Sequence, residues 1–203
     1  MRILALSDQV MDFLYSPLVG ERFGDVDVLV SCGDLPAYYL EYMVTQLNVP
    51  LLYVPGNHDP DDLRVPGGRA LDGAVARVEG ALFAGLGGSR RYKPDGRHQY
   101  SEGEMQWRVA QLAVRLWLSR LRGGRGLDVV VTHAPPLHIH DAPDLPHLGF
   151  ASFLGLLTVF RPRLLLHGHS HAQRNIEITD TTVSGTRIVN VFPYRVIDLA
   201  VPA

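Results

Sequence analysis

The histidines of this chain are concentrated in one part of the sequence. Seven of the nine fall between His133 and His171. The segment 167–171 reads His-Gly-His-Ser-His, and residues two apart on an extended chain point the same way. Two ring nitrogens could therefore converge on a metal ion. A His-x-His pair alone is a weak signal, and a structural or surface role is the alternative interpretation.

Polar side chains with oxygen or nitrogen donors also follow several short apolar runs. These side chains belong to Asp8, Asp34, Asn57 and His133. Oxygen donors mixed with imidazole suit Mn²⁺, Fe or Zn²⁺ better than Ca²⁺. Each residue alone could simply cap a turn, but capping does not explain why these residue types recur directly after strands. The pattern predicts one or two divalent metal ions per chain.

The elements that must position these groups can be predicted from hydrophobic periodicity. Short apolar runs predict buried strands at residues 3–6, 26–30, 51–54, 81–84, 129–131 and 164–166. Three helices are predicted: one opening at Pro36, one running from Ser101 to the glycines at 123–124, and one over residues 150–157. Ser101 and Glu104 form the capping box of the second helix.

The last part of the chain is predicted to contain strands and turns only. Strands are expected at 175–178, 186–192 and 196–199, with a turn at Ser184-Gly185. The stretch 60–73 is expected to be a surface loop. Strands alternating with helices predict the α/β class, with helices on the outer faces of a mixed sheet system. Polar groups at strand ends predict a site along one sheet edge.

Length and composition limit the possible classes of protein. The chain has 203 residues, 46% of them hydrophobic, which fits one domain over residues 1–203. Its 19 basic and 21 acidic residues give a net charge of −2, so charge does not imply nucleic-acid binding. The single cysteine, Cys32, excludes an intramolecular disulfide and fits the cytoplasm. No apolar stretch is long enough to predict insertion in a membrane.

Taken together, five short motifs resemble the ordered motif set of the calcineurin-like metallophosphoesterases. They are Ser7-Asp8, Gly33-Asp34, Gly56-Asn57-His58-Asp59, Thr132-His133 and Gly168-His169-Ser170-His171. The resemblance extends from Asp8 to His171. It implies a β-sandwich of mixed sheets flanked by helices, in four layers, with a binuclear metal site. It also implies hydrolysis of a phosphoester.

The resemblance assigns a role to each motif residue. Asp34 would bridge two metal ions, Asp8 and His171 would bind the first, and Asn57, His133 and His169 would bind the second. His58 would be the catalytic residue, approaching the substrate instead of a metal. Asp141, Asp144 and His147 could border the substrate but are not assigned to the site.

One position departs from the family pattern. The first motif normally reads Asp-x-His, and the position of that histidine is Val10 here. The first metal would therefore have three protein ligands, unless Gln9, Asp12 or Tyr15 compensates. The loss makes a noncatalytic metal-binding scaffold for protein contacts an alternative, against which the presence of His58 argues.

The resemblance narrows the substrate but does not name it. Protein phosphatases and dinucleotide polyphosphate hydrolases of this family carry Arg-Gly shortly after the second motif, whereas Leu35 and Pro36 follow Asp34 here. A phosphodiester or small phosphoester is therefore the expected substrate. A metallo-β-lactamase type of hydrolase is disfavoured because Ala172-Gln173 stands where an aspartate is needed. The oligomeric state is not predicted.

Overall fold

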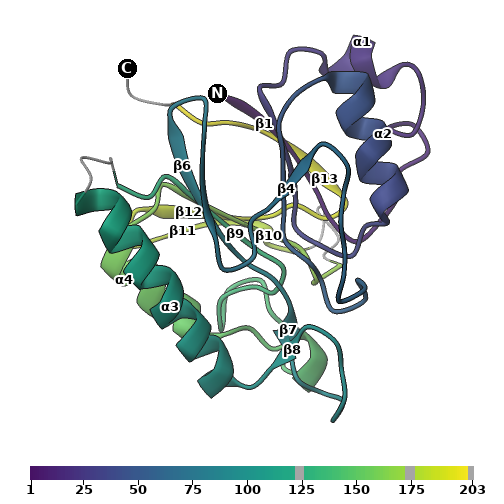
Figure 1. Cartoon of the computed structure of the whole chain (residues 1–203). Coiled ribbons are helices and arrows are strands. Elements are labelled where there is room, and N and C mark those ends of the chain that lie inside the picture. The colour runs from purple at the N-terminus through teal and green to yellow at the C-terminus, as the bar shows by residue number, and fades with distance from the viewer. Residues whose placement is uncertain (122–125, 172–176, 201–203) are drawn as a thin grey trace.

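The computed structural model describes residues 1–121, 126–171 and 177–200. Two large β-sheets stack face to face, and each is covered on its outer face by a pair of helices (Figure 1). The layers therefore follow the order helix, sheet, sheet, helix. This arrangement confirms the predicted α/β class and the sandwich of mixed sheets flanked by helices.

The first sheet has five strands in the order β13-β1-β2-β3-β4. Strands β1 to β4 run parallel to one another, and β13 is antiparallel to β1. The strand bounds are β1 (Arg2–Leu6), β2 (Val28–Ser31), β3 (Leu51–Tyr53), β4 (Gly68–Ala70) and β13 (Tyr194–Asp198). The carboxyl ends of β1, β2 and β3 therefore point to the same end of the sandwich.

The second sheet has six strands in the order β11-β12-β10-β9-β6-β5. Its four inner strands are parallel, and both edge strands are antiparallel to their neighbours. The bounds are β5 (Val75–Val78), β6 (Ala81–Leu86), β9 (Val129–Thr132), β10 (Leu164–His167), β11 (Asp180–Val183) and β12 (Thr186–Asn190). A small parallel pair, β7 (Ser89–Arg90) and β8 (Gln99–Tyr100), lies apart from both large sheets.

The helices pack on the sheets through apolar faces. The first sheet is covered by α1 (Val19–Phe23) and α2 (Ala37–Leu47), and the second by α3 (Glu102–Leu121) and α4 (Ala151–Phe160). At the start of α3 the Glu104 carboxylate accepts the Ser101 backbone N–H (2.7 Å), and the Ser101 hydroxyl accepts the Glu104 N–H (3.3 Å). The predicted capping box is therefore confirmed. A short 3₁₀ helix, η1 (Leu145–His147), precedes α4.

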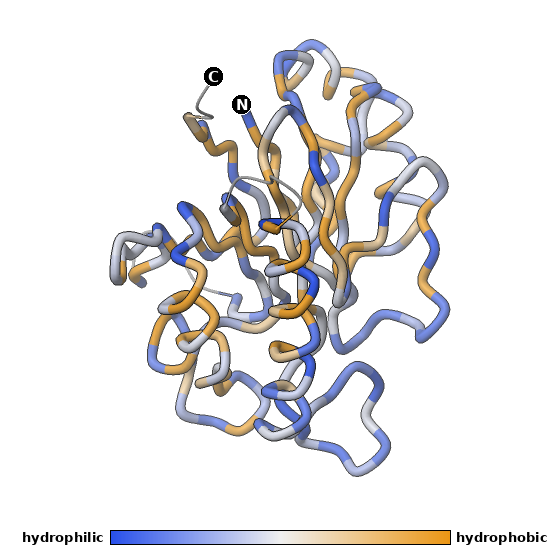
Figure 2. The backbone as a smooth tube through the Cα atoms, turned by 60° about the vertical axis from the view of Figure 1, so that its left-hand side comes forward, coloured by the Kyte–Doolittle hydropathy of each residue, from blue (hydrophilic) through white to orange (hydrophobic). Residues whose placement is uncertain are grey.

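Alternation along the strands explains the layers. In β1, Ile3 and Ala5 belong to the cluster between the sheets, whereas Leu4 and Leu6 belong to the cluster beneath α1 and α2. Residues of a strand point alternately to its two faces, so a strand buried on both sides must be apolar throughout. Figure 2 shows hydrophobic segments concentrated in the central strands and hydrophilic ones in the outer loops.

Some predicted elements differ from the structure. A strand was predicted at 175–178. Residues 177–178 are not in a strand, so the prediction is wrong there, and residues 175–176 lie outside the described part of the chain. The antiparallel partner of β12 is instead β11, directly before the predicted Ser184-Gly185 turn. The expected loop 60–73 contains the edge strand β4. The predicted helix stop at 123–124 lies outside the described residues.

Within the described part of the chain, no helix combines the length and apolarity needed to cross a bilayer.

Candidate metal centre

The predicted ligands follow strands of both sheets. Asp8, Asp34 and Asn57 follow β1, β2 and β3, whereas His133 and His169 follow β9 and β10. Backbone hydrogen bonds join the loops within each sheet: Asp8 N–H donates to the Gly33 carbonyl (3.1 Å), and Gly168 N–H to the His133 carbonyl (3.0 Å). The expectation of a site along one sheet edge was therefore too narrow, because the strand ends of both sheets meet there.

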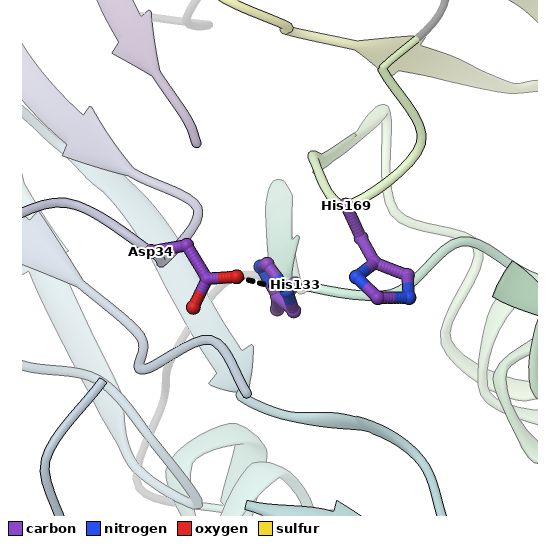
Figure 3. A group of neighbouring side chains, drawn as sticks. All are labelled: Asp34, His133 and His169. Atoms are coloured by element: carbon purple, nitrogen blue, oxygen red, sulfur yellow. Dashed lines mark ion pairs between the residues drawn. The ribbon is translucent and has the colours of Figure 1, made fainter. Parts of the chain in front are cut away.

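His133 lies at the centre of this group. Its ring is completely buried, and its Nδ1 donates to the Cys32 carbonyl oxygen (2.7 Å). Its Nε2 lies 3.3 Å from Oδ2 of Asp34 and 3.1 Å from Oδ1 of Asn57. Figure 3 shows the Asp34 carboxylate pointing at the His133 ring. The Cys32 carbonyl thus fixes which ring nitrogen faces the two oxygen donors.

His169 approaches His133 on the side opposite Asp34 (Figure 3). The two ring centroids are 4.8 Å apart. Nε2 of His169 donates to the Pro146 carbonyl oxygen (2.7 Å), which leaves Nδ1 as the nitrogen available to a cation. Ligand atoms of Asp34, His133 and His169 all lie within 4.8 Å of one another. A carboxylate and two imidazoles at this separation can bind one transition-metal ion.

A second pair of predicted ligands lies beside this group. Nε2 of His171 is 3.6 Å from Oδ1 of Asp8, and Oδ2 of Asp8 accepts the backbone N–H of His169 (2.9 Å). The Asp8 side chain is 2% exposed, whereas that of His171 is 65% exposed and stacks on the Phe192 ring. The structure thus brings five predicted ligands together at buried positions and places the sixth, His171, at their edge.

The charges of the central pair are strongly coupled. Burial alone would raise the pKa of Asp34, but the charge of His133 and its hydrogen bond lower that pKa to about 2. Burial opposes a charge on His133, yet Asp34 and the nearby Asp8 raise the pKa of His133 to about 9. Burial and the charge of His133 lower the pKa of His169 to about 4. His169 is therefore neutral at pH 7, as a metal ligand must be.

Three of the predicted ligands have a left-handed backbone. The φ angles are 64° at Asp8, 57° at Asp34 and 64° at His169. This conformation is uncommon for residues other than glycine and is found at sites where surrounding structure enforces it. Each of the three lies within three residues of the end of its strand.

A glycine permits the close approach of two ligand loops. A Cβ atom at Gly56 would overlap the carboxylate of Asp34 and crowd the ring of His133. The sequence motif Gly-Asn-His therefore needs glycine for space, so that the loop after β3 can approach the loops after β2 and β9.

Asp59 and Tyr92 contribute contacts that the sequence did not predict. Oδ2 of Asp59 accepts the backbone N–H groups of Asp34 and Gly56, each at 2.8 Å, and so joins the loops after β2 and β3. Nδ2 of Asn57 donates to the Tyr92 hydroxyl (3.3 Å), which leaves Oδ1 directed at His133. The position of Asp59 in the third motif was the available signal; Tyr92 lies in no motif.

The remaining predicted positions surround the ligand group. His58 is exposed, and its backbone N–H donates to Oδ1 of Asp34 (2.8 Å). Val10 packs against the apolar cluster beneath α1 and α2, as its residue type requires. Gln9 and Asp12 are exposed, and Tyr15 packs against tyrosine rings of α2. Compensation for the missing histidine by one of these three stays a prediction.

The chemistry of the donor set fits a divalent metal ion. Both histidines of the central group donate one ring N–H to a backbone carbonyl, which is the usual way in which proteins orient an imidazole ligand. Asp34 and Asn57 supply oxygen donors beside them. Asp34, His133 and His169 are the residues that would hold one ion, with Asn57 beside them. Asp8 and His171 lie next to this group, and a second ion that shares Asp34 stays a prediction.

Comparison with known proteins identifies the class. The sequence model of the calcineurin-like phosphoesterases matches residues 2–173. The chain therefore belongs to this family, which supports a metal-dependent phosphoesterase in general.

Two other similarities extend over nearly the whole chain. It is 28% identical over 209 residues to the uncharacterized protein MJ1162 of Methanocaldococcus jannaschii, covering 95% of this chain and 88% of that one. Its fold is similar to the crystal structure of TT1561 of Thermus thermophilus, with a TM-score of 0.66 at 19% identity, over 94% of this chain and 88% of the other.

A more distant similarity is to GAP50, described as the anchor in the inner membrane complex of Plasmodium. The TM-score is 0.53 at 12% identity, covering 94% of this chain and 70% of that one. At these identities the structural similarities concern the fold alone.

Proposed function

We propose that this protein hydrolyses a phosphodiester or another small phosphoester with a water molecule activated by divalent metal. The observation that carries the proposal is the convergence of Asp34, His133 and His169, whose ligand atoms lie within 4.8 Å of one another. Both imidazoles are oriented by backbone carbonyls, and a buried carboxylate faces them. An imidazole oriented in this way by an oxygen acceptor is typical of histidines that bind a metal.

Different residues of the site would have different roles in such a reaction. When bound, the metal would lower the pKa of a coordinated water from 15.7 to about 7 and so supply hydroxide near neutral pH. Asp34 and His133 hold opposite charges before metal binds, and His133 would give up its Nε2 proton to act as a ligand. His58 is exposed, and its backbone N–H contacts Asp34; we assign to its ring the protonation of the leaving oxygen. Such proton transfer contributes typically about 10² to 10⁴ in rate.

A phosphodiester is favoured over a phosphoprotein by the residues after the second motif. Protein phosphatases of the family have Arg-Gly shortly after this motif, whereas Asp34 is followed here by Leu-Pro-Ala-Tyr-Tyr, and Leu35 is buried among the residues beneath α2. No guanidinium therefore follows Asp34 closely in this loop. We expect Mn²⁺ to support the reaction, with Fe and Zn²⁺ as alternatives, because the donors mix oxygen with imidazole nitrogen.

The test is an assay of metal-free protein with bis(4-nitrophenyl) phosphate and 4-nitrophenyl phosphate, each with added Mn²⁺, Fe²⁺ or Zn²⁺. Release of nitrophenol that depends on metal and stops with a chelator is expected, and it should be faster with the diester. Asp34→Asn should abolish it, whereas the exposed Asp95→Asn serves as the matched control. Activity that resists chelation would overturn the proposed mechanism. Tight metal binding without turnover of either ester would favour the noncatalytic scaffold.

A further inference from the structure

The segment between β7 and β8, residues 91–98, lies against the loop that carries Asn57. Near its start, the Tyr92 hydroxyl accepts a hydrogen bond from Nδ2 of Asn57 (3.3 Å). At its end, Nε2 of His98 lies 3.2 Å from the carbonyl oxygen of Pro60. The segment is therefore held at both ends beside the candidate metal centre.

A buried glutamine fixes the backbone of Tyr92 and Lys93. Oε1 of Gln99 accepts the backbone N–H groups of both residues, each at 3.1 Å, and Gln99 itself is buried. A Cβ atom at Gly96 would overlap the amide group of Gln99, so the segment passes closely around this side chain. Although the Lys93 side chain is exposed, its backbone thus has a fixed place next to the Asn57 loop.

Lys93 differs from the neighbouring cations in its partner. The arginines of this part of the chain form ion pairs: Arg90 with Glu102, Arg91 with Glu104, Arg97 with Asp61 and Arg108 with Asp72. Among the residues that the structure describes, no carboxylate forms an ion pair with Lys93, and its Nζ instead lies 5.3 Å from the centroid of the Tyr92 ring. An aromatic ring attracts a cation without neutralising it. The charge of Lys93 is therefore available to an anion.

The side chain of Tyr92 links this charge to the candidate metal centre. Its hydroxyl contacts the predicted ligand Asn57, and its ring contacts the ammonium group of Lys93. A phosphoester at the centre carries negative charge on its nonbridging oxygens, which an ammonium group binds as a compact point charge. The lysine stem is flexible, so the ammonium group can leave the ring and reach an oxygen beside Asn57.

We propose that Lys93 is a substrate-binding residue, whose ammonium group binds a nonbridging oxygen of the phosphoryl group at the candidate metal centre. The proposal rests on the proposed phosphoesterase function and adds to it a residue outside all five motifs. A phosphodiester carries this negative charge before the reaction as well as in the transition state. Lys93 therefore stabilises both states, and its contribution belongs mainly to KM and less to kcat.

The kinetic test is Lys93→Met, which removes the charge and keeps an unbranched side chain. KM for bis(4-nitrophenyl) phosphate should rise about tenfold with little change in kcat, as expected for the loss of one hydrogen bond to a charged group. Lys93→Arg should restore most of the wild-type KM. Salt should raise the wild-type KM more than that of Lys93→Met, because it screens the ammonium charge. Metal content should be the same in all three proteins.

The matched control is Arg77→Met, which removes the same charge at an exposed position of β5. Arg77 pairs with Leu82 near the start of β6, whereas the predicted ligands follow the carboxyl ends of parallel strands. The control should keep the wild-type KM. An unchanged KM in Lys93→Met, or equal effects of the two substitutions, would overturn the proposal.

A binding experiment separates this proposal from the phosphoesterase function. Lys93 is the only lysine of the chain, so reductive methylation with ¹³C-formaldehyde labels only its amine and that of Met1, and it keeps both charges. Inorganic phosphate added to the Zn²⁺-loaded protein should shift the Lys93 resonance and leave that of Met1, whose amine contacts the Leu199 carbonyl, unchanged.

The outcomes distinguish the two proposals. A shift of the Lys93 resonance without hydrolysis of any ester would retain Lys93 as a phosphate-binding residue and refute the enzyme. Hydrolysis without a shift, and with an unchanged KM in Lys93→Met, would retain the enzyme and refute the role of Lys93. The same shift in metal-free protein would show that phosphate binds away from the candidate metal centre, and would also overturn the proposal.

Discussion

The Nε2 atom of His133 lies 3.3 Å from Oδ2 of Asp34, and both side chains are almost completely buried. The two residues follow strands of different sheets, since Asp34 follows β2 and His133 follows β9. In the absence of metal, a proton on Nε2 of His133 balances the Asp34 carboxylate. The proton thus occupies the nitrogen that a metal ion would need, and the two must compete.

Metal affinity should accordingly rise with pH. Below a His133 pKa of about 9, metal binding must displace the Nε2 proton. The apparent affinity should therefore improve by up to about tenfold for each pH unit until about pH 9, and level off above it. Titration with Mn²⁺ at several pH values, in buffers that differ in ionisation enthalpy, measures both the affinity and the released proton. Binding that is independent of pH between about 7 and 9 would show that no His133 proton has to be displaced.

Gly56→Ala should disrupt the candidate metal centre by steric overlap alone. The added Cβ would overlap the Asp34 carboxylate and crowd His133, so one of the two ligand loops must move. We expect loss of metal binding and a fall in stability of about 1 to 3 kcal/mol, as for other overpacked sites. Thermal unfolding and metal content measure the two effects.

Gly103→Ala is the matched control for this substitution. A Cβ at Gly103 would meet nothing within 4 Å, and the residue lies in α3. Alanine there should stabilise the protein by about 0.5 to 1 kcal/mol and leave metal binding unchanged. Similar behaviour of the two variants would rule out the steric explanation for Gly56.

Asp59→Ala should weaken metal binding although Asp59 is not a predicted ligand. The change leaves the backbone N–H groups of Asp34 and Gly56 without their acceptor, which costs about 1 to 3 kcal/mol for each buried donor. Asp59→Asn retains an oxygen that can accept both hydrogen bonds and should have a much smaller effect. Unfolding curves and Mn²⁺ titrations of both variants measure their stability and metal affinity. If both variants bind metal as the wild type does, Asp59 does not position the centre.

The sequence predicted most of the fold because the buried strands are apolar along nearly their whole length. All six apolar runs before residue 170 are strands, and the helices beginning near Pro36, Ser101 and residue 150 are present. The error at 177–178 arose where polar and apolar residues mix and periodicity is weak. Edge strand β4 was missed because residues 60–73 are rich in glycine and proline and only backbone pairing with β3 defines the strand.

The sequence predicted which residues form the candidate site, but it did not predict how they are arranged in space. Motifs placed each ligand directly after a strand, but no local pattern shows that two sheets bring these strand ends together. The carbonyl groups of Cys32 and Pro146, which orient His133 and His169, have no sequence signature because every residue carries a carbonyl. Tyr92 was missed for a similar reason, as it is 35 residues from its partner Asn57.

His58→Ala should lower turnover without removing metal. The side chain is exposed, and its hydrogen bond to Asp34 comes from the backbone N–H, so the ligand group should keep its geometry. If the ring acts on the leaving oxygen, kcat should fall by about 10² or more. Steady-state kinetics with bis(4-nitrophenyl) phosphate, together with metal analysis of the same samples, test this. Normal turnover would exclude His58 from the mechanism, and loss of metal would assign it to binding.

The two halves of the centre should bind metal with unequal affinity. The group of Asp34, Asn57, His133 and His169 is buried or nearly so, whereas His171 is 65% exposed and Val10 supplies no nitrogen. Loss of a supporting contact around a metal commonly costs about 10 to 100 fold in affinity, so a missing ligand should cost at least as much. Calorimetric titration of metal-free protein with Mn²⁺ should show two steps at least about tenfold apart. His171→Ala should remove only the weaker step, and His169→Ala should weaken the tighter one. Two equal steps in the wild type would mean that another group replaces the missing histidine.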